Sequence, residues 1–319
     1  MCEPNVILIR SWQMGTCVPS EILGSGGYLS RRQNSIKQIC IIIGGPCADE
    51  LVDLSAFKSL SEISWVGVRS YEDYQPLAES VQANSAHLTR LRLDFSNVTE
   101  YDRHGARTCF PLDVLQIEEG KNESKLPALQ HLSLSCVDFE EYHSEIGHAL
   151  NFAQLSSLTL RHCPATDKFL KSAILAGHPI RLRYLEIQTT NKDLDTMVHR
   201  TMIEFLQAFQ GLEKLHVAVA GPVNETLSFL QSLAHHKATL SEFVYHQRMF
   251  DDDETSMYFE KRLDLLDLSA LFHESMKWQG VNDPVNHPFL NLELRYIAVC
   301  AYPCLLVCSS LVCMENACI

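Results

Sequence analysis

The chain contains twelve cysteines among its 319 residues, but it lacks the cysteine spacing that structural zinc sites use. No Cys-x-x-Cys pair occurs in the sequence, and zinc modules usually supply their ligands in such pairs. A secretory signal is also missing, because the first residues show no basic segment followed by a clean apolar core. We therefore expect no metal site, reduced cysteines, and a cytoplasmic or nuclear location.

Basic residues are scarce. The chain has 26 Lys and Arg against 39 Asp and Glu, a formal net charge of -13 at pH 7. Nucleic acid and anionic membranes attract basic surfaces, so this balance argues against either as the main partner. A hydrophobic content of 46% with 20% charged residues is typical of a globular protein rather than a disordered one.

Signatures of catalysis and of cofactor binding are incomplete or absent. The sequence has no G-x-S-x-G motif. The stretch 39–50 resembles the start of a dinucleotide-binding site. It contains Gly44 and Gly45 but does not complete the G-x-G-x-x-G motif, because the third glycine is missing. The acidic run 251–254 lacks the spaced carboxylates and the glycine of a calcium loop. We expect no cofactor and no enzymatic activity, and an enzyme that uses His and Cys residues in loops is kept as an alternative.

The sequence does contain an internal repeat. The stretch 155–163, LSSLTLRHC, fits the pattern L-x-x-L-x-L-x-x-C without a mismatch. We call the first apolar residue of each copy its anchor. Eight of the nine gaps between successive anchors measure 23 to 31 residues, and the ninth, of 41, contains a charged loop at 118–125. The other anchors are Ile36, Leu60, Leu88, Leu129, Leu182, Leu212, Leu240, Leu263 and Leu294.

Helical periodicity fills the intervals between the copies. In 201–212, for example, Met202, Phe205, Leu206 and Phe209 share one helix face. Similar patterns occur in 144–155, 166–175 and 224–236. Each copy is thus expected to form a strand, a turn and a returning helix. Because one such unit cannot bury its own apolar face, stacked units predict an α/β leucine-rich-repeat solenoid, a horseshoe with a parallel concave sheet and convex helices.

Residues 36–300 resemble a leucine-rich-repeat protein and are similar to the repeat domain of fungal F-box/leucine-rich-repeat receptors. The stretch VPSEIL at 18–23 resembles the LPxEIL start of an F-box. The resemblance implies a substrate-recognition subunit of a cullin-type ubiquitin ligase, in which an N-terminal module docks the adaptor and the repeats bind the substrate. The alternative is a stand-alone scaffold or regulator without a ligase link.

The N-terminal resemblance is short. GSGG at 24–27 occupies the place of an apolar helix, and glycines oppose helix formation. The segment 1–35 is therefore expected to be a truncated F-box remnant or disordered, and VPSEIL is also open to being a chance match. At the other end, 301–319 forms an apolar, cysteine-rich tail. The uncharged run 296–314 approaches the length of a membrane span, but a terminal strand or cap is the preferred interpretation.

The candidate partner-binding residues lie on the expected concave face. Successive strand residues alternate between faces, so the second, fourth and sixth residues after each anchor should line that face. Arg and Tyr are common anchors of protein interfaces, which favours a protein partner with an acidic or polar segment. Simple solvation of these residues is the alternative. The selected residues are Arg90, Arg92, His131, Arg161, Tyr184, Lys214 and His216.

Overall fold

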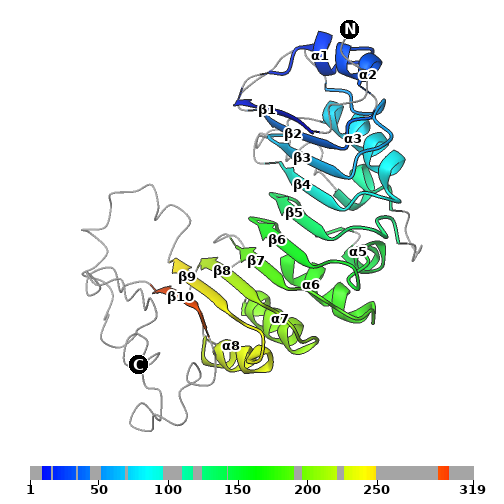
Figure 1. Cartoon of the computed structure of the whole chain (residues 1–319). Coiled ribbons are helices and arrows are strands. Elements are labelled where there is room, and N and C mark those ends of the chain that lie inside the picture. The colour runs from blue at the N-terminus through cyan, green and yellow to red at the C-terminus, as the bar shows by residue number, and fades with distance from the viewer. Residues whose placement is uncertain are drawn as a thin grey trace, which may run out of the picture. The chain divides into compact units, whose positions relative to one another are not determined.

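The chain divides into two compact units, Met1–Pro179 (unit 1) and Ile180–Ile319 (unit 2). Each is an α/β unit in which strands alternate with helices (Figure 1). The computed structural model describes eleven stretches of the chain. They are residues 9–15, 17–33, 35–43, 52–68, 71–95, 110–117, 124–141, 143–189, 196–220, 226–248 and 294–301.

Unit 1 contains a parallel sheet whose strands pair in the order of the chain, from β1 to β6. Most of its labelled helices lie along one side of the sheet, and the first two lie at its β1 end (Figure 1). The strands are β1 (Ile9–Gly15), β2 (Gln38–Ile43), β3 (Glu62–Val66), β4 (Arg90–Asp94), β5 (His131–Ser135) and β6 (Ser157–Arg161). The helices are α1 (Ser20–Leu23), α2 (Tyr28–Arg32), α3 (Tyr71–Asn84), the π-helical turn η1 (Phe110–Val114), α5 (His143–Ala149) and α6 (Thr166–Leu175).

Unit 2 has the same strand arrangement as unit 1. Its strands β7 to β10 pair in parallel and in chain order. Sequential parallel pairing of this kind is compatible with a solenoid. The strands are β7 (Tyr184–Gln188), β8 (Lys214–Ala220), β9 (Glu242–Arg248) and β10 (Tyr296–Ala301). The helices are α7 (Thr196–Gln207), α8 (Thr226–Ser232) and the 3-10 turn η3 (Leu233–His236).

The strands begin where the anchors predict them. Each anchor in the described residues stands two positions before a strand, from Ile36 before β2 to Leu294 before β10. The repeat pattern does not predict β1. Arg10 of β1 pairs in register with Ile39 of β2, so a charged residue stands where the repeat has an apolar one. The copy at Leu263 lies outside the described residues.

Side chains of the strands sort onto two faces. In every strand from β2 to β9 the third and fifth residues after the anchor are buried, as Leu91 and Leu93 are in β4. The alternation follows from the pleat of a strand. Each fully buried leucine contributes about 2 kcal/mol of transfer free energy, so this ladder of apolar residues holds the helices against the sheet.

A repeated backbone contact fixes the register at the start of the strands. The N–H groups of Thr89 and Arg90 both donate to the carbonyl of Ser61, at 2.8 and 3.1 Å. In unit 2 the N–H of Ser241 donates to the carbonyl of Glu213 at 2.8 Å. Thr89 and Ser241 add a hydroxyl donor to the same carbonyls. Because Ser61, Thr89, Glu213 and Ser241 each directly follow an anchor, the spacing of anchors sets the pairing.

A buried polar side chain stands four residues before an anchor in both units. The Oδ1 atom of Asn84 accepts the backbone N–H of Leu60 at 2.8 Å, and its amide donates to two further carbonyls. The Nδ1 atom of His236 accepts the backbone N–H of Leu212 at 3.4 Å, while its Nε2 lies 2.9 Å from the carbonyl of Leu206. Each side chain thus satisfies the N–H of the preceding anchor.

Helices occur in all four predicted segments, but only one of them has the predicted bounds. The predicted helix at 166–175 is confirmed as α6. Helix α7 buries Met202, Phe205 and Leu206 as expected, whereas Phe209 is buried just after the helix ends. The other two predicted helices are shorter than expected: α5 ends at Ala149, and the segment that starts at Thr226 changes to a 3-10 turn at Leu233.

The segment 1–35, expected as an F-box remnant or as disordered, contributes β1, α1 and α2. Helix α1 ends at Leu23, directly before the glycines that oppose it. The expectation of reduced cysteines is wrong for Cys17, which is disulfide-bonded. It holds for Cys40, Cys136 and Cys163, whose thiols are reduced.

Several sequence predictions fall outside the described residues, namely the glycine pair after β2, the acidic run 251–254 and the tail beyond Ala301. Within the described stretches, no helix has the length and apolar character that crossing a bilayer requires.

Candidate functional site

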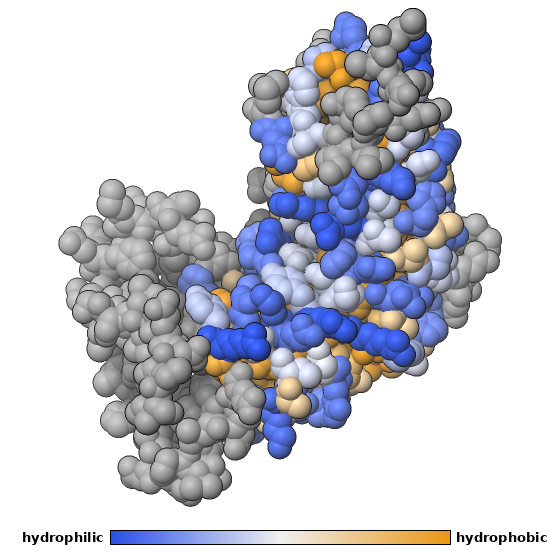
Figure 2. Space-filling model, viewed as in Figure 1, coloured by the Kyte–Doolittle hydropathy of each residue, from blue (hydrophilic) through white to orange (hydrophobic). Residues whose placement is uncertain are grey.

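The face of each sheet opposite the buried ladder carries the candidate residues. It consists of the second, fourth and sixth residues after each anchor, and we call it the accessible face of unit 1 or of unit 2. Most described residues in the view of Figure 2 are hydrophilic or intermediate, with apolar residues in small areas between them. Polar side chains in neighbouring strands stand opposite one another because the strands are in register.

On the accessible face of unit 1, one polar row crosses β2 to β5. The amide of Gln38 donates to Oε1 of Glu62 at 2.9 Å, and the guanidinium of Arg90 lies 3.6 Å from Oε2 of the same carboxylate. His131 follows in register beside Arg90. The charge of Arg90 is therefore partly balanced by Glu62, although both side chains remain accessible. An exposed pair of this kind contributes little to stability.

The pKa of His131 is lowered from its ordinary value. Partial burial is the main cause, the positive charge of Arg90 adds to it, and Glu62 opposes it. The ring is consequently neutral at physiological pH and offers one donor and one acceptor to a ligand.

Arg92 occupies the middle row of the same face and is exposed. Ser64 of β3 and Ser133 of β5 flank it in register. Within the part of the chain that the structure describes, no hydrogen bond or ion pair joins the Arg92 guanidinium to another residue. Its charge is thus available to a ligand, in contrast to that of Arg90.

Arg161 ends β6 and pairs in register with Ser135. Its neighbour Thr159 was expected on the accessible face but is buried, with 6% of its surface exposed. Arg90, Arg92, His131 and Arg161 therefore all lie on unit 1, on three consecutive strands.

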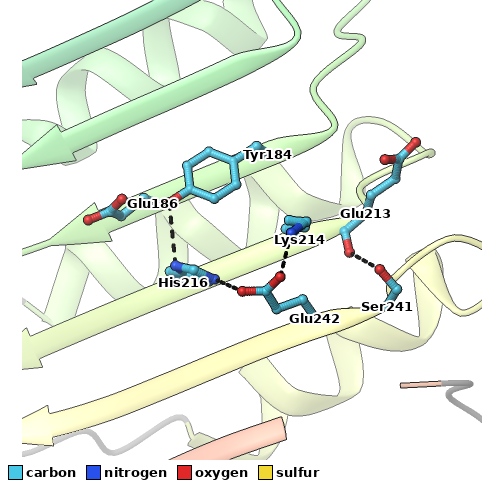
Figure 3. Close-up of polar contacts among 7 residues, drawn as sticks. All are labelled: Tyr184, Glu186, Glu213, Lys214, His216, Ser241 and Glu242. Carbon is cyan, nitrogen blue, oxygen red and sulfur yellow. Dashed lines mark hydrogen bonds and ion pairs between the residues drawn. The ribbon is translucent and has the colours of Figure 1, made fainter. Parts of the chain in front are cut away.

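The accessible face of unit 2 carries a connected polar network (Figure 3). Glu242 of β9 is its centre: one carboxylate oxygen lies 2.6 Å from the ammonium of Lys214 and the other lies 2.7 Å from Nε2 of His216. The Nδ1 atom of His216 lies 3.4 Å from the hydroxyl of Tyr184. That hydroxyl donates to Glu186 at 2.6 Å. The three candidate residues of unit 2 are thus brought together.

The electrostatics of this network favour ionised Glu242. Its pKa is lowered chiefly by the hydrogen bond from Lys214, with burial opposing and with the hydrogen bond and charge of His216 adding to the effect. One carboxylate therefore contacts both the ammonium of Lys214 and the ring of His216. The positive charge of Lys214 is balanced by Glu242 within the face, so unit 2 offers less attraction for an acidic segment than Arg92 does in unit 1.

Two residues of this network were not among the candidates. Glu186 is buried, with 5% of its surface exposed, between Tyr184 and Gln188 of its own strand. Alternation along β7 places all three on one face. Glu242 was on the predicted face, but its double role depends on the register of β8 against β9, which single-strand patterns do not reveal.

A separate apolar cavity of about 200 Å³ lies in unit 1 among β1, β2, α1 and α2. Its walls are mostly aliphatic and aromatic and bring no cluster of polar groups together. The lining residues are Ser11, Trp12, Ile22, Leu23, Leu29, Ile39, Cys40 and Ile41.

Comparison with known proteins identifies no relative: no family model matches the chain, and no curated protein or solved structure matches it significantly. Among the residues that the structure describes, no group of three or more His, Cys, Asp or Glu side chains is placed to hold a metal ion. Cys163, at the cysteine position of its repeat, is buried, and its thiol lies 3.6 Å from the carbonyl of Leu134.

Proposed function

We propose that this chain is a leucine-rich-repeat protein of the solenoid class and that its accessible faces bind another protein without catalysis. The observation that carries the proposal is the recurrence of accessible polar side chains at fixed positions after each anchor, on strand after strand. Such rows suit an extended partner, because they repeat at the spacing of the strands. Tyr184 and the arginines of unit 1 supply residue types that anchor interfaces.

The charge pattern favours an acidic segment on unit 1. Arg92 has a guanidinium without a described partner, and Ser64 and Ser133 place hydroxyls on both sides of it. A guanidinium fork binds carboxylates in a bidentate manner, and the hydroxyls add donors. The overall charge of -13 does not exclude such binding, because the local arrangement decides the contact.

The stand-alone form of this function is favoured over the ubiquitin-ligase form. The stretch that resembles an F-box start provides helices of only four and five residues, and β2 follows them. An adaptor-docking module needs longer packed helices, as the resemblance implies. The ligase form predicts that a cullin adaptor purifies with the full chain, whereas the stand-alone form predicts partners without it.

The test is quantitative affinity purification of the tagged full chain, of Arg92→Glu and of the control Arg32→Glu. Arg32 is an exposed arginine on α2, away from the face. We expect Arg92→Glu to reduce recovery of the specific partner by about tenfold or more, because like charges then oppose each other. The control should retain the partner. Equal recovery from all three chains would contradict a partner contact at Arg92.

A further inference from the structure

The apolar cavity of unit 1, which we call the β1 cavity, lies between the first two strands and the helices α1 and α2 at the β1 end of the sheet (Figure 1). Trp12 of β1 stands in register with Ile41 of β2, on the side of the sheet that carries the buried ladder. Ser11 pairs with Cys40 and belongs to the opposite side, where the thiol of Cys40 lies 3.6 Å from the amide nitrogen of Gln13. The strand side chains that face the cavity are therefore apolar.

The helices complete the cavity with further apolar side chains, and glycines join them. The helical wall consists of Ile22, Leu23 and Leu29. In the turn between α1 and α2, a Cβ atom at Gly24 would lie 2.5 Å from the carbonyl oxygen of Ser20, and one at Gly27 would lie 2.7 Å from that of Ile22. Since these oxygens belong to the backbone, the turn requires glycines at both positions. The glycines thus supply no side chain that fills the cavity.

Backbone hydrogen bonds hold the walls apart. The N–H of Gly24 donates to the carbonyl of Ser20 at 2.7 Å, and the N–H of Asp53 donates to the carbonyl of Leu23 at 2.7 Å. On the other side, β1 is paired with β2. Leu23 is buried, whereas Trp12 and Ile22 are only half-buried. The cavity is consequently preformed, with its accessible side at Trp12 and Ile22.

The chemistry of the walls determines what the cavity can hold. None of the described residues that line it carries a charge, so an ionic ligand would lose its hydration without gaining a partner. Water occupies a buried cavity where it finds roughly two to four polar partners, and apolar cavities stay dry. The atoms that line an empty apolar cavity lose dispersion contacts, which an apolar molecule restores.

We propose that the β1 cavity is a binding site for a small, uncharged, apolar molecule. Its volume of about 200 Å³ sets the size. Because apolar cavities of about 150 Å³ take up benzene, a single substituted aromatic ring or a short aliphatic chain fits. The site is distinct from the proposed protein-binding function, since Arg92 lies on the accessible face and the cavity lies on the other side of the sheet.

The binding site is tested by NMR on the full chain with labelled isoleucine methyl groups, with toluene as the probe. The methyl signals of Ile22, Ile39 and Ile41 are assigned from the three single Ile→Val variants, and Ile146 of α5 is the reference in the same unit. We expect the three cavity signals to shift with toluene in a saturable manner and the Ile146 signal to stay in place. Phenol has nearly the same shape but buries a hydroxyl without a partner, so it should bind about tenfold more weakly or less.

A filled cavity provides the second arm of the test. Leu29→Trp adds side-chain volume to the helical wall and should abolish the toluene shifts. The matched control Leu175→Trp places the same side chain at an exposed leucine of α6 and should retain them.

Unshifted cavity signals at saturating toluene, equal affinity for phenol, or unchanged toluene binding by folded Leu29→Trp would each overturn the proposal. The titration of the unaltered chain decides the question even if Leu29→Trp does not fold, because the shifted methyl groups locate the probe. Failure of this site leaves the contact at Arg92 untouched, and loss of the partner in Arg92→Glu leaves the toluene result untouched.

Discussion

At the scale of single residues, Asn84 shows how a polar group stabilises the interior of unit 1. The side chain is fully buried, yet each of its polar atoms has a partner. It satisfies the N–H of the anchor Leu60 and the carbonyl of Phe57, which the sheet and helix ladders leave unpaired. Leaving a buried backbone group without a partner costs more free energy of folding than an average hydrogen bond contributes.

Asn84→Ala should therefore reduce the free energy of unfolding by about 3 kcal/mol. The substitution removes one acceptor and the amide that donates to the carbonyls of Phe57 and Ser80, and it leaves the N–H of Leu60 and the carbonyl of Phe57 buried without partners. Chemical denaturation followed by circular dichroism measures the change.

Asn151→Ala provides the matched control. Asn151 also stands four residues before an anchor, but it is only half-buried, and its amide lies 3.2 Å from the carbonyl of Pro127. This variant should lose clearly less stability than Asn84→Ala. Equal losses would show that the position, and not the buried hydrogen bonds, determines the cost.

At the scale of elements, Gly147 permits the close packing of α5 against α6. A Cβ atom at this position would lie 2.4 Å from the carbonyl oxygen of Ser172 and 2.7 Å from its carbonyl carbon. Both are backbone atoms of α6, so a side-chain rotation cannot relieve the contact. The absence of a side chain at residue 147 thus sets the separation of the two helices.

Gly147→Ala should destabilise the chain by about 2 kcal/mol, although alanine has the higher helix propensity. The overlap with the backbone of α6 outweighs the propensity gain of roughly 1 kcal/mol. Denaturant unfolding measures the effect, with Ser144→Ala on the exposed side of α5 as control. Adding Ser172→Ala to Gly147→Ala should not restore the lost stability, because the backbone of α6 remains in place. A recovery of stability would refute a clash with the backbone.

The same scale shows how much of the fold the sequence predicts. An anchor specifies its strand because two further apolar residues must reach the buried side at fixed spacing, so Leu60 or Leu240 is enough to locate β3 or β9. The anchor pattern does not predict β1, because Arg10 stands where an apolar residue is expected. Helix ends are less predictable, since α5 and α8 stop before their apolar periodicity does.

The candidate site was predictable only in part, for a related reason. Alternation within one strand assigns Tyr184 and His216 to the accessible face, but it does not say which side chains meet across strands. The double contact of Glu242 depends on the register between β8 and β9. The burial of Glu186 depends on the side chains that cover it. Both are properties of the assembled sheet, and a single repeat contains neither.

At the scale of the whole molecule, two buried histidines link stability to pH. Burial lowers the pKa of His199 to about 4. Burial also lowers the pKa of His236 to about 4, although the hydrogen bond to the carbonyl of Leu206 opposes the shift. Above the ordinary histidine pKa of 6.5, both histidines are neutral in the folded chain and in the unfolded chain. Below it, the unfolded chain binds protons that the folded chain does not, so stability falls as the pH decreases towards 4.

Between about pH 7.5 and pH 5, each of these histidines should reduce the free energy of unfolding by on the order of 2 kcal/mol. Carboxylates with ordinary pKa values stay largely ionised over this range, which isolates the histidine contribution. His236→Asn should remove about 2 kcal/mol of the decrease, because asparagine does not titrate and Asn84 shows that this side chain suits the equivalent position. Urea unfolding at a series of pH values measures the slope. The exposed His235→Asn should leave the slope unchanged, and a slope that is the same in His236→Asn as in the unaltered chain would mean that His236 is protonated in the folded state.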